Sequence, residues 1–331
     1  MNHLLFLYCT KIILIAFLSL ILLLVNSKEC KVLSIEGGGT EGAFEAGALN
    51  AFSEFLKLDD LEYDIITGVS VGTLTGGALS FSSNSNLTRT INLISNLWLN
   101  ITDNQIFTNW KDWGIINGIL FKPGIFDNSP EKSLVNTILH QVGDKLHRNF
   151  TIGITDAQQG IYFTESDPVI TNALHFITGS SAMPGAFPPE QIDQFLGIDG
   201  GTTYNLDLFS PIHFCKSNGY QENQIIIDAL LTDSLKIQVI NSTNFTSMWM
   251  YNRAKSIMKI HKKYFFLNET MEIHPNIIWR YLIIPSKQIP LMILNFIPLD
   301  TNPIHLKEAF DMGYNESKKQ IFKAKSIPIR Y

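Results

Sequence analysis

Residues 31–82 place the strongest constraint on the fold, because they contain two strand–turn–helix units in succession. In the first unit, the apolar residues 32–35 lead into three consecutive glycines and an alanine-rich segment, which predicts a strand, a tight turn and a helix. In the second, a strand centred on residues 65–66 leads into the turn at 68–72 and a helix of small residues. Strands that alternate with helices indicate βαβ units and a parallel sheet. We therefore expect an α/β fold.

The rest of the chain contains no Pro/Gly/Ser-rich linker, which favours a single domain. Residues 84–148 show apolar residues at helical spacing. Further strands are predicted at residues 150–157, 160–166, 194–199, 223–231 and 276–285, and a helix at residues 305–324. The apolar stretch 277–299 is interrupted by charges and prolines, which favours a buried strand and loop over a membrane span. We expect part of this stretch to line an acyl pocket or to contact a lipid surface.

The N-terminal residues 1–27 have the pattern of a targeting segment. Lys11 precedes a largely apolar run of 14 residues, 12–25, which suits the central region of a signal peptide and is short for a membrane span. We predict cleavage near Ser27. The alternative is an uncleaved signal anchor, because residues 4–8 are apolar as well. Both interpretations place the body of the protein in the secretory pathway, either secreted or lumenal, or held at the membrane by this segment.

Two other features agree with a secretory route. Seven sequons match the N-glycosylation rule, at Asn86, Asn100, Asn149, Asn241, Asn244, Asn268 and Asn315. Cys30 and Cys215 remain after cleavage, and an oxidising compartment would allow them to form a disulfide. The alternative is two free or buried thiols.

The turn after the second strand carries the first catalytic candidate. Gly68, Ser70 and Gly72 form a G-x-S-x-G pattern between a strand and a helix, which is the context of a nucleophile elbow. The alternative is an ordinary strand-to-helix turn. Asp199, followed by Gly200 and Gly201, ends another predicted strand and is a candidate general base, although Asp-Gly-Gly is also common in plain turns.

The glycine-rich loop after the first strand is a candidate oxyanion hole, because a helix N-terminus presents several backbone N–H groups. The loop consists of Gly37, Gly38, Gly39, Thr40, Glu41 and Gly42. It formally matches the G-x-G-x-x-G pattern of dinucleotide sites. The second strand, however, ends in the serine turn and not in the acidic residue that such a site requires, and the acids around the loop repel pyrophosphate. We therefore expect no nucleotide to bind at this loop.

A net charge of −5 with 17% charged residues also argues against nucleic-acid binding.

The segments "GGGTEG", "GVSVG" and "DGG", in this order, resemble the patatin-like phospholipase family. The segments "GSSAMPGAFPPEQIDQFLGIDGG", "FTIGITDAQQGIYFTES" and "LKEAFDMGYNES" extend the resemblance over residues 31–324. It implies a three-layer fold with a mostly parallel central sheet flanked by helices. It further implies a Ser70–Asp199 dyad, an oxyanion hole in the glycine loop, and hydrolysis of fatty-acyl esters of phospholipids or related lipids in lipid catabolism. The family implies an acyl-enzyme and neither metal nor cofactor, with a lipid substrate at a membrane surface.

The sequence departs from the family at Glu41, where the family has Arg or Lys. A carboxylate at this position would reverse the local field and lower the activity or change the head-group preference. The alternatives are that Glu41 only begins the helix, where acidic residues are favoured, or points to solvent.

Two other classes of protein compete with this interpretation. One is an α/β-hydrolase triad, for which His213, His261, His274 and His305 are available, although Ser70 comes too early in the chain. The other is a secreted lipid-binding or storage protein that keeps the fold without the activity.

Overall fold

The computed structural model describes residues 28–237, 239, 246–289 and 297–326. The predicted targeting segment, Asn241 and Asn244 lie outside the described residues. A mixed eight-stranded sheet has the order β5-β6-β3-β2-β1-β7-β8, and β4 pairs with β3. The strands are β1 (Cys30–Ile35), β2 (Ile65–Val69), β3 (Asn149–Asp156), β4 (Ile161–Ser166), β5 (Glu190–Ile192), β6 (Phe195–Asp199), β7 (Ile225–Leu230) and β8 (Ile278–Ile283).

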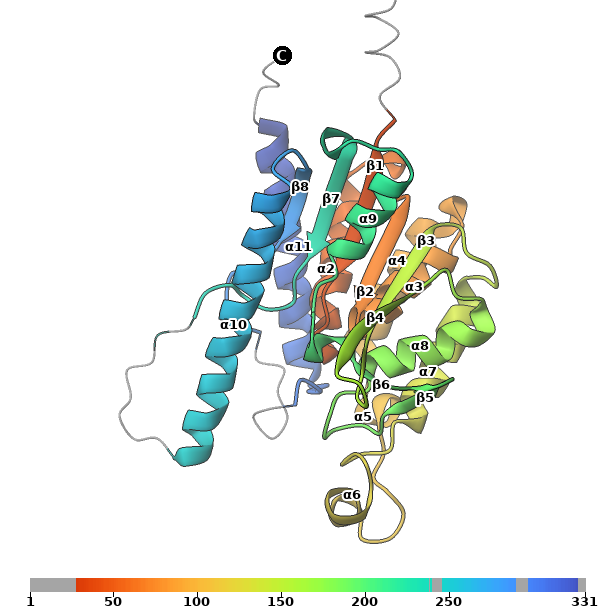
Figure 1. Cartoon of the computed structure of the whole chain (residues 1–331), viewed down its shortest axis with the longest axis vertical. Coiled ribbons are helices and arrows are strands. Elements are labelled where there is room, and N and C mark those ends of the chain that lie inside the picture. The colour runs from red at the N-terminus through yellow and green to blue at the C-terminus, as the bar shows by residue number, and fades with distance from the viewer. Residues whose placement is uncertain (1–27, 238, 240–245, 290–296, 327–331) are drawn as a thin grey trace, which may run out of the picture.

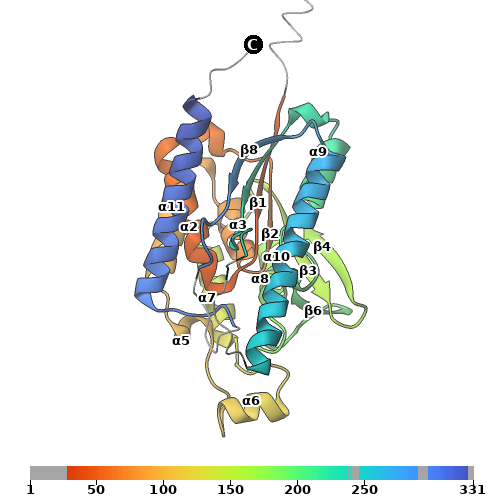
Figure 2. The same ribbon diagram turned by 90° about the vertical axis from the view of Figure 1, so that its left-hand side faces the viewer.

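Helices cover both faces of this sheet, which gives three layers (Figures 1 and 2). The α-helices are α2 (Gly42–Phe55), α3 (Val71–Phe81), α4 (Leu87–Asn100), α5 (Asp103–Ile106), α6 (Ile115–Phe121), α7 (Ser129–Val142), α8 (Ile170–Ser181), α9 (Phe209–Ser217), α10 (Ser247–Ile273) and α11 (Pro303–Ser326). In Figure 2, α2 and α11 lie on one side of the sheet, and α9 and α10 lie on the other. No helix in the described part of the chain is long and apolar enough to cross a bilayer.

Side chains that alternate in direction along the central strands form two hydrophobic cores, one on each face of the sheet. In β1, Leu33 and Ile35 pack with α2, α4 and α11, whereas Cys30 and Val32 pack with α9 and residues of β7. Side chains of successive strand residues point to opposite faces, so a strand with helices on both faces is apolar throughout. This arrangement confirms the α/β fold predicted from the sequence.

The topology differs from the expectation in one respect that matters for the site. The five strands β3, β2, β1, β7 and β8 are parallel, but β6 runs antiparallel to β3. Asp199 at the end of β6 pairs with Ile154 of β3. It therefore reaches the carboxyl edge of the parallel strands from an antiparallel strand. Helices α8, α9 and α10 were not predicted.

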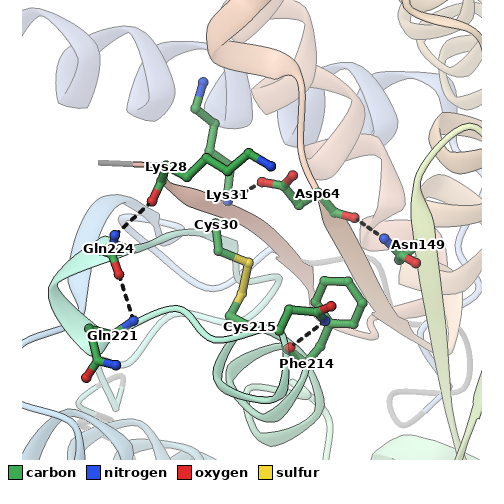
Figure 3. The surroundings of a disulfide bond; sticks show 10 residues. Lys28, Cys30, Lys31, Asp64, Asn149, Phe214, Cys215, Gln221 and Gln224 are labelled. Atoms are coloured by element: carbon green, nitrogen blue, oxygen red, sulfur yellow. Dashed lines mark hydrogen bonds between the residues drawn. A yellow bond between two sulfur atoms is a disulfide. The ribbon is translucent and has the colours of Figure 1, made fainter. Parts of the chain in front are cut away.

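A disulfide joins Cys30 of β1 to Cys215 of α9 across 185 residues of chain (Figure 3). Both cysteines are fully buried. The bond fixes the first strand of the sheet to a helix on its face. Closing so long a loop restricts the unfolded chain, and native disulfides of this kind contribute about 2–5 kcal/mol to stability.

We therefore expect the Cys30→Ala/Cys215→Ala variant to lose about 2–5 kcal/mol in the free energy of unfolding. Urea denaturation with and without dithiothreitol measures this loss. The reductant should lower the midpoint of the wild type and leave that of the double variant unchanged. A wild type that does not respond to full reduction would contradict a stabilising disulfide.

Candidate active site

Ser70 occupies the sharp turn that connects β2 to α3. Its backbone has φ 53° and ψ −127°, a conformation that costs a non-glycine residue on the order of 1–3 kcal/mol. A Cβ atom on Gly68 would lie 2.3 Å from the carbonyl oxygen of Gly72, so the turn closes only with glycine at position 68. The geometry is that of a nucleophile elbow, with the serine side chain presented at the edge of the sheet.

Asp199 accepts a hydrogen bond from this serine. The distance from Ser70 Oγ to Asp199 Oδ2 is 2.7 Å, and the second carboxylate oxygen accepts a 2.7 Å hydrogen bond from the N–H of Gly201. Burial raises the pKa of Asp199 to about 6, although the hydrogen bonds from Ser70 and Gly201 favour the charged form. The carboxylate thus has both the position and the pKa that a general base needs near neutral pH.

Ser180, which the sequence pattern did not single out, holds the backbone of the nucleophile turn. Its hydroxyl oxygen accepts a 2.8 Å hydrogen bond from the N–H of Ser70 and donates a 2.6 Å hydrogen bond to the carbonyl oxygen of Gly153. This link joins the turn to β3 and is buried. Ser180 lies in the segment "GSSAMP" that carries the family resemblance, but a serine in a sequence does not reveal its partner.

The glycine loop lies directly beside the nucleophile turn, since a Cβ atom on Gly37 would lie 2.7 Å from Cβ of Ser70. Four of its six N–H groups already donate to backbone carbonyl oxygens, namely those of Gly37, Thr40, Glu41 and Gly42. Asn205 and Pro298 provide two of these carbonyl groups, at 3.0 and 2.9 Å. Within the described residues, no hydrogen bond occupies the N–H of Gly38 or Gly39. Of the six residues predicted to form the oxyanion hole, two therefore have N–H groups available to bind an oxyanion.

Glu41 is buried at the start of α2, with 1% of its surface exposed. The alternative that it points to solvent is therefore wrong. Burial raises the pKa of Glu41 well above its usual range; Asp233 acts in the same direction, while Lys259 and Lys263 oppose it. This direction disfavours the carboxylate on which the expected reversal of the local field depends. That reversal stays a prediction.

Helix α10 brings cations to the glycine loop from the other end of the sequence. Lys263 Nζ lies 2.6 Å from Glu36 Oε1 and 3.1 Å from Asp233 Oδ2. Lys259 Nζ lies 2.5 Å from the same oxygen of Asp233. Burial raises the pKa of Asp233, but the two ammonium groups outweigh this effect and hold that pKa well below its usual range; Asp233 in turn raises the pKa of Lys259 against the desolvation of its ammonium group. Sequence reasoning missed these lysines because it missed the helix.

Two cavities meet at Ser70, and the second has more polar residues in its lining than the first. The first is mainly apolar and is lined by Val71, Leu74, Trp98, Ile101, Ile106, Leu134, Val135, Ile177, Met183, Phe187 and Leu299. The second contains Gly38, Asp199 and one face of α10, formed by Asn252, Lys255, Ser256 and Lys259. Gly39 and Ser70 line both. Leu299 belongs to the apolar stretch for which a role in an acyl pocket was expected.

The four candidate histidines do not contact this site. Among the described residues, none of them hydrogen-bonds to Ser70 or lines the two cavities. His274 pairs with Glu222 at 2.8 Å and His305 pairs with Asp300 at 2.5 Å, while His213 and His261 are exposed. This geometry does not support a histidine-containing triad.

The described sequons lie mostly at the surface. Exposed asparagines are Asn86, Asn100, Asn268 and Asn315. Asn149 is half-buried at the start of β3, and its side-chain amide donates a 2.8 Å hydrogen bond to the carbonyl oxygen of Asp64. Glycosylation stays a prediction.

Comparison with known proteins identifies the family of the chain. The model of the family "Patatin-like phospholipase" matches residues 33–212, and the chain belongs to that family. Among solved structures, the chain is similar to VipD from Legionella pneumophila, with 12% identity, a TM-score of 0.41, and coverage of 90% of this chain and 67% of VipD. It is also similar to the type III effector protein ExoU, with 11% identity, a TM-score of 0.31, and coverage of 90% of this chain and 54% of ExoU, so it spans about half of that protein.

No curated protein matches the sequence. Membership of the family supports lipid hydrolase activity in general terms and a lipid as substrate.

The state of Glu41 can be tested with Glu41→Gln. The folded state holds the proton of Glu41 more tightly than the unfolded chain, so the free energy of unfolding falls as pH rises above 4.5, the ordinary pKa of this group. Glutamine does not titrate. Glu41→Gln should therefore lose less stability than the wild type between about pH 5 and pH 8, by up to about 1.4 kcal/mol per pH unit.

Urea denaturation at the two pH values measures this difference. Glu29→Gln, at an exposed position near the start of β1, controls for the loss of one carboxyl group and should follow the wild type. Equal losses in Glu41→Gln and the wild type would show that Glu41 is ionised in the folded protein.

Proposed function

We propose that the protein is a serine lipid acyl hydrolase of phospholipase A type, with Ser70 as nucleophile and Asp199 as general base. The observation that carries the proposal is the 2.7 Å hydrogen bond from Ser70 Oγ to Asp199 Oδ2 in a strained turn beside the unoccupied N–H groups of the glycine loop. A nucleophile, a base and an oxyanion site are what ester hydrolysis requires.

The reaction follows from these positions. Asp199 takes the hydroxyl proton as Ser70 Oγ attacks the ester carbonyl carbon, and the negative charge develops on the carbonyl oxygen. The N–H groups of Gly38 and Gly39 stabilise that oxyanion. The proton passes to the leaving alcohol as the ester bond breaks, which leaves an acyl group on Ser70. Water then attacks the acyl-enzyme while Asp199 takes a proton from it, and that proton passes to Ser70 Oγ as the acyl–oxygen bond breaks and the fatty acid is released.

The two cavities define how the lipid would lie. The apolar cavity suits a fatty-acyl chain, because it removes hydrocarbon from water. The cavity beside α10 suits a phosphate-bearing head group, because Lys255 and Lys259 line it. Since Ser70 lies where the cavities meet, the ester between head group and chain would be placed at the nucleophile.

The cell location belongs to the same proposal. The disulfide between Cys30 and Cys215 and the exposed sequons support a secreted or lumenal enzyme in lipid catabolism. The main alternative is a secreted lipid-binding or storage protein without activity. The strained serine, with its carboxylate partner, favours the enzyme, since a binding protein has no need of either.

Fatty-acid release from phospholipids, galactolipids and triacylglycerols tests the proposal. Ser70→Ala should reduce the rate to background, and Asp199→Asn should reduce it by roughly 10²–10⁴-fold. Asp193→Asn makes the same change at an exposed position on the β5–β6 hairpin and should retain the wild-type rate. A wild type no faster than Ser70→Ala on every lipid would establish the non-enzymatic alternative.

The pH dependence gives a second test. Only ionised Asp199 accepts the serine proton, so kcat/KM should fall about tenfold per pH unit below the pKa of about 6. Glu131 also lines the apolar cavity, and burial raises its pKa to about 7. If Asp199 is the titrating group, Glu131→Gln should keep the midpoint near 6. If the midpoint disappears in Glu131→Gln, the titrating group is Glu131 and not Asp199.

A further inference from the structure

Residues 108–127 form a protrusion that carries α6 away from the body of the protein (Figures 1 and 2). Five large apolar side chains of this protrusion are between 57% and 75% exposed, namely Trp113, Ile116, Ile119, Leu120 and Phe121. We call this set the apolar tip. Single exposed apolar residues are normal on a protein surface, whereas a group of this kind indicates an interaction surface.

Hydrogen bonds and close backbone packing hold the protrusion in place, although the side chains at its tip form no hydrophobic core. Thr108 and Asp127 close its base with paired backbone hydrogen bonds of 2.9 Å in each direction. Trp110 Nε1 donates a 3.0 Å hydrogen bond to the carbonyl oxygen of Gly124. A Cβ atom on Gly118 would lie 2.1 Å from the carbonyl oxygen of Ile125, so α6 packs through its glycine. Its large apolar side chains are left on the outside.

The base of the protrusion is bonded to the wall of the active site. The N–H of Ile125 donates a 3.0 Å hydrogen bond to the carbonyl oxygen of Gly185, and the N–H of Phe126 donates a 2.9 Å hydrogen bond to that of Ala186. In the same loop, Met183 lines both cavities at Ser70, and Phe187 lines the apolar one. The base of the protrusion is therefore directly joined to the loop that lines the site.

The charges beside the apolar tip and the direction in which it projects indicate what kind of partner binds it. Lys111 and Lys122 flank the tip and are exposed, as is Asp112; the other acidic residue of the protrusion, Asp127, lies at its base. Tryptophan, aliphatic side chains and flanking lysines are the composition of segments that lie in a lipid–water interface. In both views, α6 projects from the same end of the molecule as the N-terminal end of α10, where Met250 and Tyr251 are 50% and 59% exposed (Figures 1 and 2).

We propose that the apolar tip inserts into the interface of a lipid bilayer and so places the opening at Ser70 against the membrane. The proposal rests on the proposed function for its purpose, since a lipid hydrolase must reach a substrate held in a bilayer. Binding to the surface does not itself require the chemistry of Ser70. The two ideas can therefore fail separately.

The test is co-sedimentation of the protein with vesicles of phosphatidylcholine and phosphatidylserine. Leu120→Ser/Phe121→Ser should weaken vesicle binding by about tenfold or more, because two inserted side chains become polar. The control is Phe265→Ser/Ile273→Ser, which changes two residues of α10 that are 60% and 57% exposed and lie away from α6. It should bind as the wild type does. Equal binding by the tip variant and the wild type would overturn the proposal.

Two further measurements separate the possible causes of a loss of vesicle binding by the tip variant. On a short-chain ester in solution, the tip variant should keep the wild-type rate, and on vesicles it should lose rate in proportion to binding. If the wild type hydrolyses neither substrate, the proposed function fails while co-sedimentation still decides the docking. Sedimentation velocity without lipid should show the same mass for both proteins; a wild-type dimer that the tip variant lacks would assign the tip to a second copy of the chain and overturn the proposal.

Discussion

The site depends on the contact of two backbone turns at the carboxyl edge of the sheet. A Cβ atom on Gly72 would lie 2.5 Å from the carbonyl oxygen of Ile35, and one on Gly37 would lie 2.7 Å from Cβ of Ser70. Side chains at these positions would push the turn after β1 away from the turn after β2. Because β1 and β2 are adjacent and parallel, glycine at both places brings the N–H groups of one turn beside the hydroxyl of the other. Neither motif makes a site alone, and the sheet supplies the register that joins them.

The three glutamates around the glycine loop show that an acidic sequence need not give an acidic site. Glu36 is paired with Lys263 at 2.6 Å. Glu45 accepts a 2.7 Å hydrogen bond from Thr75, and burial raises its pKa to about 8. Burial also raises the pKa of Glu41 well above its usual range. Burial favours the neutral form of a carboxyl group that has no cation in contact. The positive charge that the loop lacks comes from α10.

The sequence predicted what local pattern determines and missed what depends on tertiary contacts. The two strand–turn–helix units, Ser70 and Asp199 were all placed correctly at the edge of the sheet, because apolar runs and glycine turns are local signals. The occupied N–H groups of the glycine loop were not predictable, since Asn205 and Pro298, whose carbonyl groups bind them, are far along the chain. Helix α10 was missed because its sequence is polar and shows little separation of apolar and polar faces. The raised pKa of Glu41 depends on its burial, and the residue type alone does not show whether a side chain is buried.

The segment between β2 and β3 connects the chemistry to the substrate. It contributes α4, α5 and α7, whose side chains Trp98, Ile106 and Leu134 line the apolar cavity, and it also carries α6. Ser70, the proposed nucleophile, precedes these helices in the turn after β2, while the proposed base and oxyanion donors come from the end of β6 and from the turn after β1. The proposed chemical groups are therefore positioned by the sheet, while one helical segment provides part of the wall of the apolar cavity and the exposed apolar tip. The base of the protrusion is hydrogen-bonded to the loop that walls the site, and the N–H of Asp199 donates a 2.9 Å hydrogen bond to the carbonyl oxygen of Ala182 in the same loop, so backbone hydrogen bonds connect the apolar tip to the Ser70–Asp199 pair.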